Sequence, residues 1–403
     1  MQKTVFPMSL KLEYSRYRLP FRVPLRTAHG LWSEREGLLL RLTDMSEPPA
    51  GPTDDPGNRP RTGFGEIAPI PWFGTETVDE AEALLRELGD RVNDATLDAL
   101  PGRYACTHFA LHSARAKCGV RNAACGLTEP ASASPLSVPH PAPSALPVAA
   151  LLPAGRLALT QIAPKAELGF RTFKWKVGAG DAADELALLD DVIAALPDGA
   201  RLRLDANGAW DHRTAGRWLE RAADRPVEFI EQPVSPAARG ADDLLLGLAG
   251  DYPTPLALDE SLVGATDAAR WLSLGWPGIW VIKPALLGDP AGVLAQLAAA
   301  GVAREDVVFS SALETAVGAR AVLELAFAWH AGPPPGAAGA PAAAGGSTGA
   351  RPAKPRALGF GIWPLFTGAH RDCDGLGELP FVRPRDPERL DAQAAWDHLQ
   401  RPA

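Results

Sequence analysis

The sequence predicts an α/β protein in which a parallel (β/α) barrel follows a smaller α+β domain. After residue 145, short apolar strands alternate with helical stretches rich in Ala and Leu. The charged residues that end five successive strands follow one another at intervals of 24 to 29 residues: Lys176, Asp205, Glu231, Asp259 and Lys283. No GxGxxG segment follows a strand, which disfavours a doubly wound open sheet, the alternative for such a rhythm. About eight units favour closure into a barrel.

The composition is typical of a globular protein with a large core. The chain has 403 residues, of which 46% are hydrophobic and 22% charged, and its formal net charge of −8 excludes a generally basic nucleic-acid binder. We find no apolar run long enough for a membrane span and no export signal at the start. The four cysteines show no CxxC spacing. We therefore expect a cytoplasmic protein with a small-molecule partner, and neither a nucleic-acid nor a membrane partner.

Residues 1–125 are expected to form the α+β domain. The segments EGLLLRLTD and TGFGEIAPI have the composition of paired strands. The helical stretch TVDEAEALLRELGDRVNDA begins at Thr77, which can cap it together with Glu80 three residues later. A second helix is expected over Tyr104–Cys118.

Three tracts rich in Pro, Gly and Ala hold almost no large apolar residues, so we expect surface loops there. They cover Pro48–Arg61, Glu129–Ala145 and Gly332–Arg356. The second belongs to a linker over residues 126–145. The third is an insertion over residues 332–356 in a barrel domain that spans 146–368, and residues 369–403 form a C-terminal segment.

The eight barrel strands are predicted in chain order. Their sequences are PVAALL, TFKWKVG, RLRLDANG, EFIEQPV, PLALDES, GIWVIKP, DVVFSSA and ALGFGIW. Charged residues stand at the carboxyl ends of the apolar runs, which is where barrel active sites are built. Because side chains alternate between faces, Lys174 and Lys176 share one face of their strand, and Arg203, Asp205 and Asn207 share one face of the next.

Three carboxylates from successive strands, those of Asp205, Glu231 and Asp259, are expected to converge. Oxygen ligands of this kind suit Mg²⁺, with water and substrate oxygens completing the shell. A single charge at a strand end is usually just solvated. Five consecutive strands ending in the order Lys, carboxylate, carboxylate, carboxylate, Lys make that explanation a poor one.

Lysine is scarce in this chain, with eight Lys against 32 Arg, yet Lys occupies positions 174, 176 and 283. Arginine cannot act as a base near neutral pH, whereas the pKa of a lysine near a cation can be lowered. A divalent cation flanked by lysines suits removal of a proton α to a carboxylate. The metal stabilises the enediolate, and a lysine takes the proton.

The segments FKWKVG, RLDANGAW, FIEQP, ALDES and VIKP together resemble the motifs of the muconate-lactonizing branch of the enolase superfamily, with its KxK motif and opposing lysine. The segments PFRVPLRTAHG, REGLLLRL, GEIAPIPWFGTET, ALLPAG, SSALETAVG and LGFGIWPLF narrow the resemblance to the o-succinylbenzoate synthase family. The similarity covers most of residues 12–385 outside the three tracts. It implies a (β/α)7β barrel whose N-terminal capping domain is completed by the C-terminal segment.

The resemblance also implies roles for individual residues. The implied ligands of Mg²⁺, for which Mn²⁺ can substitute, are Asp205, Glu231 and Asp259. The implied reaction is a lyase reaction, the syn dehydration of 2-succinyl-6-hydroxy-2,4-cyclohexadiene-1-carboxylate to o-succinylbenzoate in menaquinone and phylloquinone biosynthesis. Lys176, with Lys174 as its neighbour, would remove the ring α-proton and return it to the departing hydroxide. Lys283 would stabilise the enediolate from the other side, by charge or by cation–π contact.

Weaker candidates are Arg203, Asn207, Glu260, Ser310 and Ser311. Arg203 could orient the base or a carboxylate, or form an ion pair inside the barrel, and Asn207 could support the metal ligands. Glu260 follows a predicted ligand on the opposite face, where it could pair with a Lys or Arg of a neighbouring strand. Ser310 and Ser311 could receive the succinyl carboxylate or cap their strand. By resemblance, two loops of the first domain bring four more residues over the barrel mouth: Thr27, His29, Trp72 and Phe73.

The nearest alternative is another enzyme of the same branch, an N-acylamino acid racemase or a dipeptide epimerase. Such an enzyme would share Lys176, Lys283 and the metal. Dipeptide epimerases carry a DxD motif at the end of the eighth strand, which ALGFGIW lacks, and Asp372-Cys373-Asp374 comes only later. A non-catalytic barrel is the alternative from another class, and the intact set of carboxylates and lysines disfavours it.

Overall fold

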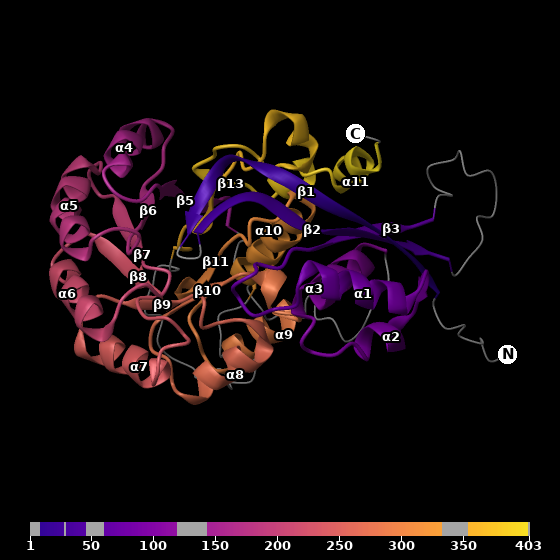
Figure 1. Ribbon diagram of the computed structural model, residues 1–403, viewed down its shortest axis with the longest axis horizontal. Helices are drawn as coiled ribbons and strands as arrows, with labels where there is room; N and C mark the ends of the chain where they lie inside the picture. Colours follow the sequence, from indigo (N-terminus) through magenta and orange to yellow (C-terminus); the bar gives the residue numbers. More distant parts are fainter. Residues whose placement is uncertain (1–8, 28–29, 46–59, 119–142, 333–353, 402–403) are drawn as a thin grey trace, which may run out of the picture.

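The computed structural model describes residues 9–27, 30–45, 60–118, 143–332 and 354–401 (Figure 1). Within them, an antiparallel sheet with its helices stands beside a ring of parallel strands surrounded by helices. No helix in these ranges is long and apolar enough to cross a membrane. Most of the three low-complexity tracts, and with them most of the predicted linker and of the predicted insertion, lies outside the described residues.

The N-terminal part is a four-stranded sheet in the order β3-β2-β1-β4. Its strands are β1 (Leu10–Thr27), β2 (Gly30–Asp44), β3 (Thr62–Ile67) and β4 (Arg91–Val92). Its helices are α1 (Val78–Leu88), α2 (Asp94–Asp98) and α3 (Ala105–Lys117). Helix α3 lies directly against β3 because Gly65 has no side chain. A Cβ atom there would lie 1.9 Å from the Ala110 carbonyl oxygen.

The helix predicted from Thr77 begins as expected but ends early. The Thr77 hydroxyl accepts a hydrogen bond from the Glu80 backbone N–H (3.2 Å), and the Glu80 carboxylate accepts one from the Thr77 N–H (2.8 Å). Helix α1 then stops at Leu88, because Gly89 adopts a φ of 77° that a right-handed helix does not contain. The rest of the stretch forms β4 and α2, so the prediction of one continuous helix is wrong.

The barrel confirms the (β/α)7β prediction, with eight parallel strands and seven intervening α-helices in the part of the chain that is described. The strands are β5 (Leu146–Leu152), β6 (Thr172–Lys176), β7 (Arg201–Asp205), β8 (Val227–Glu231), β9 (Leu256–Leu258), β10 (Ile279–Ile282), β11 (Val307–Phe309) and β12 (Leu358–Gly361). The helices are α4 (Leu157–Glu167), α5 (Ala182–Ala195), α6 (His212–Ala222), α7 (Ala241–Asp251), α8 (Gly264–Ser273), α9 (Pro290–Ala299) and α10 (Ala316–Ala331). Strands β5 to β11 pair in chain order, β12 pairs with β5, and a bridge between Ser310 and Gly359 closes the ring.

Side chains alternate along each barrel strand between the helices and the interior. Trp175 and Leu204 belong to the main core between sheet and helices. Strand residues on the inner side form a separate apolar cluster, made of Phe229, Ala257, Ile279, Val281 and Val308. Lys174 and Lys176 flank Trp175 and both line the same cavity, so they share one face as predicted.

After β12 the chain returns to the N-terminal sheet (Figure 1). This segment contains η4 (Gly368–Cys373), β13 (Phe381–Val382), η5 (Asp386–Arg389) and α11 (Ala392–Gln400). Strand β13 pairs with β5. The ring centroid of Trp396 in α11 lies 4.9 Å from the guanidinium carbon of Arg41 in β2. Phe366 forms an isolated β-bridge with Phe21 in β1. The C-terminal segment thus joins the barrel to the N-terminal sheet.

Candidate active site

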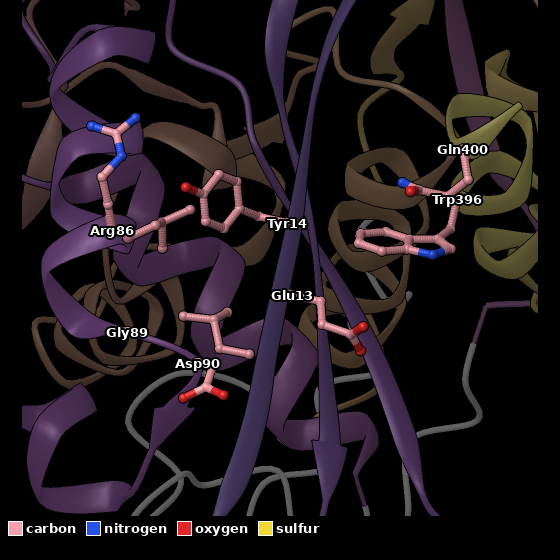
Figure 2. A pocket seen from close by; sticks show the side chains of 9 residues that line it. Glu13, Tyr14, Arg86, Gly89, Asp90, Trp396 and Gln400 are labelled. Carbon is pink, nitrogen blue, oxygen red and sulfur yellow. The ribbon is translucent and has the colours of Figure 1, made fainter. Parts of the chain in front are cut away.

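A cavity of about 550 Å³ lies at the carboxyl ends of the barrel strands, facing the N-terminal sheet. Its polar lining consists of Lys174, Lys176, Asp205, Asn207, Asp259, Glu260, Lys283, Ser310 and Ser311. Trp32, Trp72 and Phe73 contribute to an apolar wall from the N-terminal part. A second cavity, of about 450 Å³, lies among β1, α1 and α11 and contains none of the predicted site residues (Figure 2).

The three predicted metal ligands end three neighbouring strands. In the register of the sheet, Lys176 lies beside Asp205, and Asp205 lies beside Glu231. Asp259 directly follows β9, the next strand around the ring. All three carboxylates are buried. Buried charges of one sign need cations close by, and two lysines supply them in this structure.

The Lys174 ammonium lies between two of these carboxylates. Its Nζ is 2.9 Å from Asp205 Oδ2 and 2.6 Å from Glu231 Oε1. Burial alone would lower the pKa of Lys174, but the charges of Asp205, Glu231 and Asp259 raise it above its ordinary value. Lys174 is therefore held as a cation, which makes it a poor base.

Lys283 is the cation at the third carboxylate. Its ammonium forms an ion pair with Asp259, and its Nζ lies 4.9 Å from the centroid of the Phe73 ring. Burial would lower the pKa of Lys283, but Asp259, Glu260 and Glu231 raise it above its ordinary value. Lys283 thus presents a fixed positive charge to the cavity.

Lys176 lines the same cavity, yet its side chain makes no ion pair or hydrogen bond with any other residue that the structure describes. It does act at longer range on its neighbour Asp205. Burial would raise the pKa of Asp205, but Lys174 and then Lys176 lower it. Of the three lysines, Lys176 is the one whose amine is not engaged by a carboxylate in the described part of the chain.

The floor of the cavity suits a divalent cation. Burial raises the pKa of Glu231 to about 7 although the Lys174 charge lowers it, and repulsion from the other two carboxylates adds to the rise. Asn207 Oδ1 and Glu260 Oε2 are buried without a hydrogen-bond partner among the described residues. Such an excess of buried oxygen over donors fits a hard cation such as Mg²⁺. In the described ranges, ammonium groups hold the carboxylates, and no ready-made metal cluster is formed.

Glu260 reaches the cavity, although strand alternation places it on the opposite face from Asp259. Strand β9 ends at Leu258 and the chain then turns, so the alternation no longer applies. Glu260 Oε1 accepts a hydrogen bond of 2.9 Å from Asn207 Nδ2. The partner is therefore an amide that follows β7, two strands away in the ring, in place of the Lys or Arg of a neighbouring strand that the sequence suggested.

Arg203 does not line this cavity. Its Nε donates to Glu228 Oε2 (2.7 Å) and its guanidinium donates to the Ala357 carbonyl oxygen (2.7 Å). Glu228 stands near the start of β8, so the Arg203 side chain turns away from the carboxyl ends of the strands. The sequence left two roles open for Arg203, and the structure shows the ion pair inside the barrel. The expectation that Arg203 orients the base or a carboxylate is wrong for this geometry.

The predicted residues of the N-terminal part divide into two pairs. Trp72 and Phe73 line the cavity, and Trp72 packs edge-on against Trp32 with ring centroids 4.9 Å apart. Thr27 is the last residue of β1. Its side chain and the whole of His29 lie outside what the structure describes, so their predicted role stays a prediction.

The two serines lie on the cavity wall after β11. The Ser311 hydroxyl donates to Glu314 Oε2 (2.9 Å) and accepts from the Leu313 backbone N–H (2.9 Å). These bonds correspond to the local capping role. Ser310 closes the ring with Gly359, so its backbone, too, has a structural task.

Two buried residues beside the site were not predicted from the sequence. Gln232 Oε1 accepts hydrogen bonds from the backbone N–H groups of Asp259 (3.0 Å) and Ser261 (3.1 Å), which orients the third predicted ligand. Within the described residues, all hydrogen bonds of the Arg35 side chain, which belongs to β2, go to backbone carbonyl groups. Gln232 directly follows a predicted ligand and could have been found from that position, whereas Arg35 begins the quoted segment REGLLLRL, which indicates no role for it.

Comparison with known proteins finds a matching family, two similar proteins and a similar solved structure. Residues 158–334 match the family described as enolase C-terminal domain-like. An o-succinylbenzoate synthase from Thermosynechococcus vestitus is 37% identical over 324 residues, 80% of this chain and 90% of the relative. A hydrophobic dipeptide epimerase from Roseobacter litoralis is 31% identical over 276 residues, 65% of this chain and 72% of the relative. The crystal structure of o-succinylbenzoate synthase from Thermosynechococcus elongatus BP-1, complexed with Mg in the active site, matches with a TM-score of 0.68 at 32% identity and covers 94% of this chain and 98% of that one.

Proposed function

The chain belongs to the o-succinylbenzoate synthase family of the enolase superfamily, a family of lyases, and we propose that it dehydrates 2-succinyl-6-hydroxy-2,4-cyclohexadiene-1-carboxylate to o-succinylbenzoate with Lys176 as base. Part of the proposal is a cytoplasmic role in menaquinone or phylloquinone biosynthesis. One observation carries the choice of reaction. Gly359 and Gly361 line the cavity at the end of the eighth strand, where a dipeptide epimerase has carboxylates for the ammonium group of its substrate.

Lys176 would carry the proton through both halves of the reaction. Its neutral amine takes the proton from the ring carbon that bears the carboxylate, and the C–H bonding electrons enter the enediolate. The resulting ammonium then protonates the hydroxyl group as the adjacent C–O bond breaks. Water leaves, the ring becomes aromatic, and Lys176 is neutral again. Because one group serves both steps, both occur on one face, as a syn dehydration requires. The unengaged side chain of Lys176 supports this role.

The remaining charges would stay fixed. A bound Mg²⁺, for which Mn²⁺ could substitute, would supply positive charge to the enediolate oxygens from a site made by Asp205, Glu231 and Asp259. Lys283, held by Asp259 and by the face of Phe73, would remain an ammonium on the other side of the ring. Fixed charges of this kind stabilise the transition state without having to reorganise.

The dipeptide epimerase is the second candidate, because the relative from Roseobacter litoralis is 31% identical to this chain. Its function would require a carboxylate near the substrate amine. Asp374, the second aspartate of the Asp372-Cys373-Asp374 sequence, instead accepts hydrogen bonds from the backbone N–H groups of Leu365 (2.9 Å) and Phe366 (3.1 Å). Asp372 and Asp374 both lie outside the set of cavity-lining residues. In the described part of the chain, the second candidate therefore lacks DxD carboxylates at the cavity.

The test compares two lysine variants in two assays. Lys176→Arg should lose dehydration by at least about 10²–10⁴-fold, because Arg cannot exchange a proton at neutral pH. Lys283→Arg keeps a positive charge near the enediolate and should lose less. The second assay follows deuterium exchange at the α-carbon of both enantiomers of an N-acylamino acid. A two-base racemase predicts instead that each variant exchanges only one enantiomer.

Lys165→Arg is the matched control, since Lys165 pairs with Glu378 and does not line the cavity. It should dehydrate the substrate at the wild-type rate. If the wild-type protein does not dehydrate the cyclohexadiene while it exchanges both enantiomers rapidly, the racemase or epimerase function replaces the one proposed.

A further inference from the structure

Each end of the segment Glu66–Glu76 in the N-terminal part is a buried glutamate. Each glutamate carboxylate accepts hydrogen bonds from backbone N–H groups at the start of a helix. Glu66 accepts hydrogen bonds from the backbone N–H groups of Thr315 (2.9 Å) and Gly318 (2.9 Å) at the start of α10. Glu76 accepts them from Cys106 (3.2 Å) and Thr107 (2.7 Å) at the start of α3. The hydrogen bonds of Glu66 connect the N-terminal sheet to the barrel, so they hold the two parts against each other.

Arg35 holds the middle of the same segment. Its guanidinium donates to the carbonyl oxygens of Ala68 and Pro69 (2.6 Å to Pro69) within the segment. It also donates to Leu313 (3.1 Å) and Ala312 (3.4 Å), which follow barrel strand β11. A fifth bond, to the Glu36 carbonyl oxygen (3.0 Å), stays within β2. One side chain therefore spans the N-terminal segment and the barrel loop.

Both segments joined by Arg35 form walls of the cavity. The N-terminal segment carries Phe73, whose ring faces the Lys283 ammonium. The barrel loop carries Leu313, which lines the cavity and has a φ of 62°, a left-handed conformation that is costly for a leucine. Such a backbone persists only where its surroundings hold it. The bonds from Arg35 to the Leu313 carbonyl oxygen and from the Leu313 N–H to Ser311 hold it here.

We propose that Arg35 is a positioning residue that sets the distance between the Phe73 and Leu313 walls of the cavity and thereby the affinity for the substrate. The inference rests on the proposed dehydration for the identity of the substrate. Arg35 is not among the described residues that line the cavity, so it acts through residues that do: the two walls and Trp32, whose ring centroid lies 5.3 Å from the guanidinium carbon.

The guanidinium is suited to this task by its shape more than by its charge. Arg35 is 1% exposed and forms no ion pair with a carboxylate among the described residues. Its five N–H groups are matched by five carbonyl oxygens. A lysine has three donors on a single nitrogen and cannot bridge carbonyl groups that point in from two segments. Arg35→Lys therefore keeps the charge and removes the bridge.

The experiment measures kcat and KM of Arg35→Lys with the cyclohexadiene substrate, together with Kd for o-succinylbenzoate by calorimetry. Loss of two buried hydrogen bonds to one wall should raise KM and Kd by about tenfold, while kcat should stay within about threefold of wild type. Arg115→Lys is the matched control. Arg115 is also buried in the N-terminal part, where it pairs with Asp94 (2.8 Å). This control should lower the melting temperature and leave KM unchanged.

Three results overturn the proposal: wild-type KM and Kd in folded Arg35→Lys, an equal rise in KM in Arg115→Lys, or a fall in kcat with unchanged KM. If Arg35→Lys does not fold, Thr315→Val tests the same coupling, because it removes the hydroxyl bond to Glu66 (2.6 Å). It should raise KM by about threefold, and an unchanged KM would contradict the proposal. If wild type fails to dehydrate the substrate, the proposed function fails alone. The same KM ratios are then measured by α-proton exchange of an N-acylamino acid.

Discussion

Replacing Glu314 by glutamine should stabilise the protein, and the gain should depend on pH. Glu314 is 1% exposed beneath the cavity wall, and burial raises its pKa from 4.5 to about 7, with a further contribution from the nearby Glu66. The folded protein thus holds this proton more tightly than the unfolded chain. The resulting stabilisation is complete below pH 4.5 and is lost as the pH rises through 7.

The glutamine side chain in Glu314→Gln cannot ionise, and its carbonyl oxygen can keep the bonds from the Ser311 hydroxyl and the Ala312 N–H. Between pH 5 and pH 8.5 the free energy of unfolding of the wild-type protein should fall by about 2.5 kcal/mol through this group. The Glu314→Gln variant should not show this fall. Urea unfolding of both proteins at the two pH values measures this difference. The matched control is Glu228→Gln. The charges of Arg203 and Arg356 lower the pKa of Glu228 although it is partly buried.

The control should therefore destabilise the protein by the same amount at pH 5 and at pH 8.5, since a lowered pKa changes stability only on the acid side of 4.5. If the stability difference between Glu314→Gln and wild type is equal at the two pH values within about 0.5 kcal/mol, the burial argument for Glu314 is refuted.

Two further predictions concern the metal and the barrel wall. Exhaustive chelation should abolish dehydration, and added Mg²⁺ should restore it and raise the melting temperature. Asp205→Asn should remain folded but lose that rise, and full turnover in excess chelator with no metal by elemental analysis would contradict the ligand assignment. Gly361→Ala should fold poorly, with a loss of more than about 3 kcal/mol, because its Cβ atom would lie 2.0 Å from the Ala149 carbonyl oxygen. Gly368→Ala meets nothing within 4 Å and should keep the wild-type yield and melting temperature; equal behaviour of the two variants would contradict the packing argument.

The barrel could be predicted because each strand is a short apolar run, and five successive strands, β6 to β10, end in or are followed directly by a charged residue. Alternation then placed Lys174 and Lys176 on one face, and the cavity lining agrees. Alternation fails where a strand stops. Glu260 enters the cavity because β9 ends two residues earlier and the chain turns. Likewise, helix α1 ends at Leu88, because the positive φ of the next residue, Gly89, interrupts a stretch with helical composition.

Residues whose partners lie far away in the chain could not be predicted. Arg203 shares a face with Asp205, and only the position of Glu228 and the Ala357 carbonyl oxygen shows that it turns to the other end of the barrel. Arg35 bonds to backbone oxygen atoms at position 313. Backbone acceptors have no residue type, so no motif could indicate them.

The surroundings of Lys174 and Lys176 give a physical reason why lysine and not arginine occupies these two positions. A guanidinium at position 174 could bind Asp205 and Glu231 with two parallel bonds each and would neutralise them durably. An ammonium is a point charge on a flexible stem, and at 2.9 and 2.6 Å it balances both carboxylates with a single atom. A divalent cation can replace an ammonium at these carboxylates at a lower free-energy cost than it could replace a guanidinium that binds with two parallel bonds. At position 176 the reason differs, because the proposed base has to exchange a proton near neutral pH, which Lys can do and Arg cannot. Under the proposed mechanism, Lys174 serves as an exchangeable counter-charge and Lys176 as the base, so an Arg at either position should impair a different step.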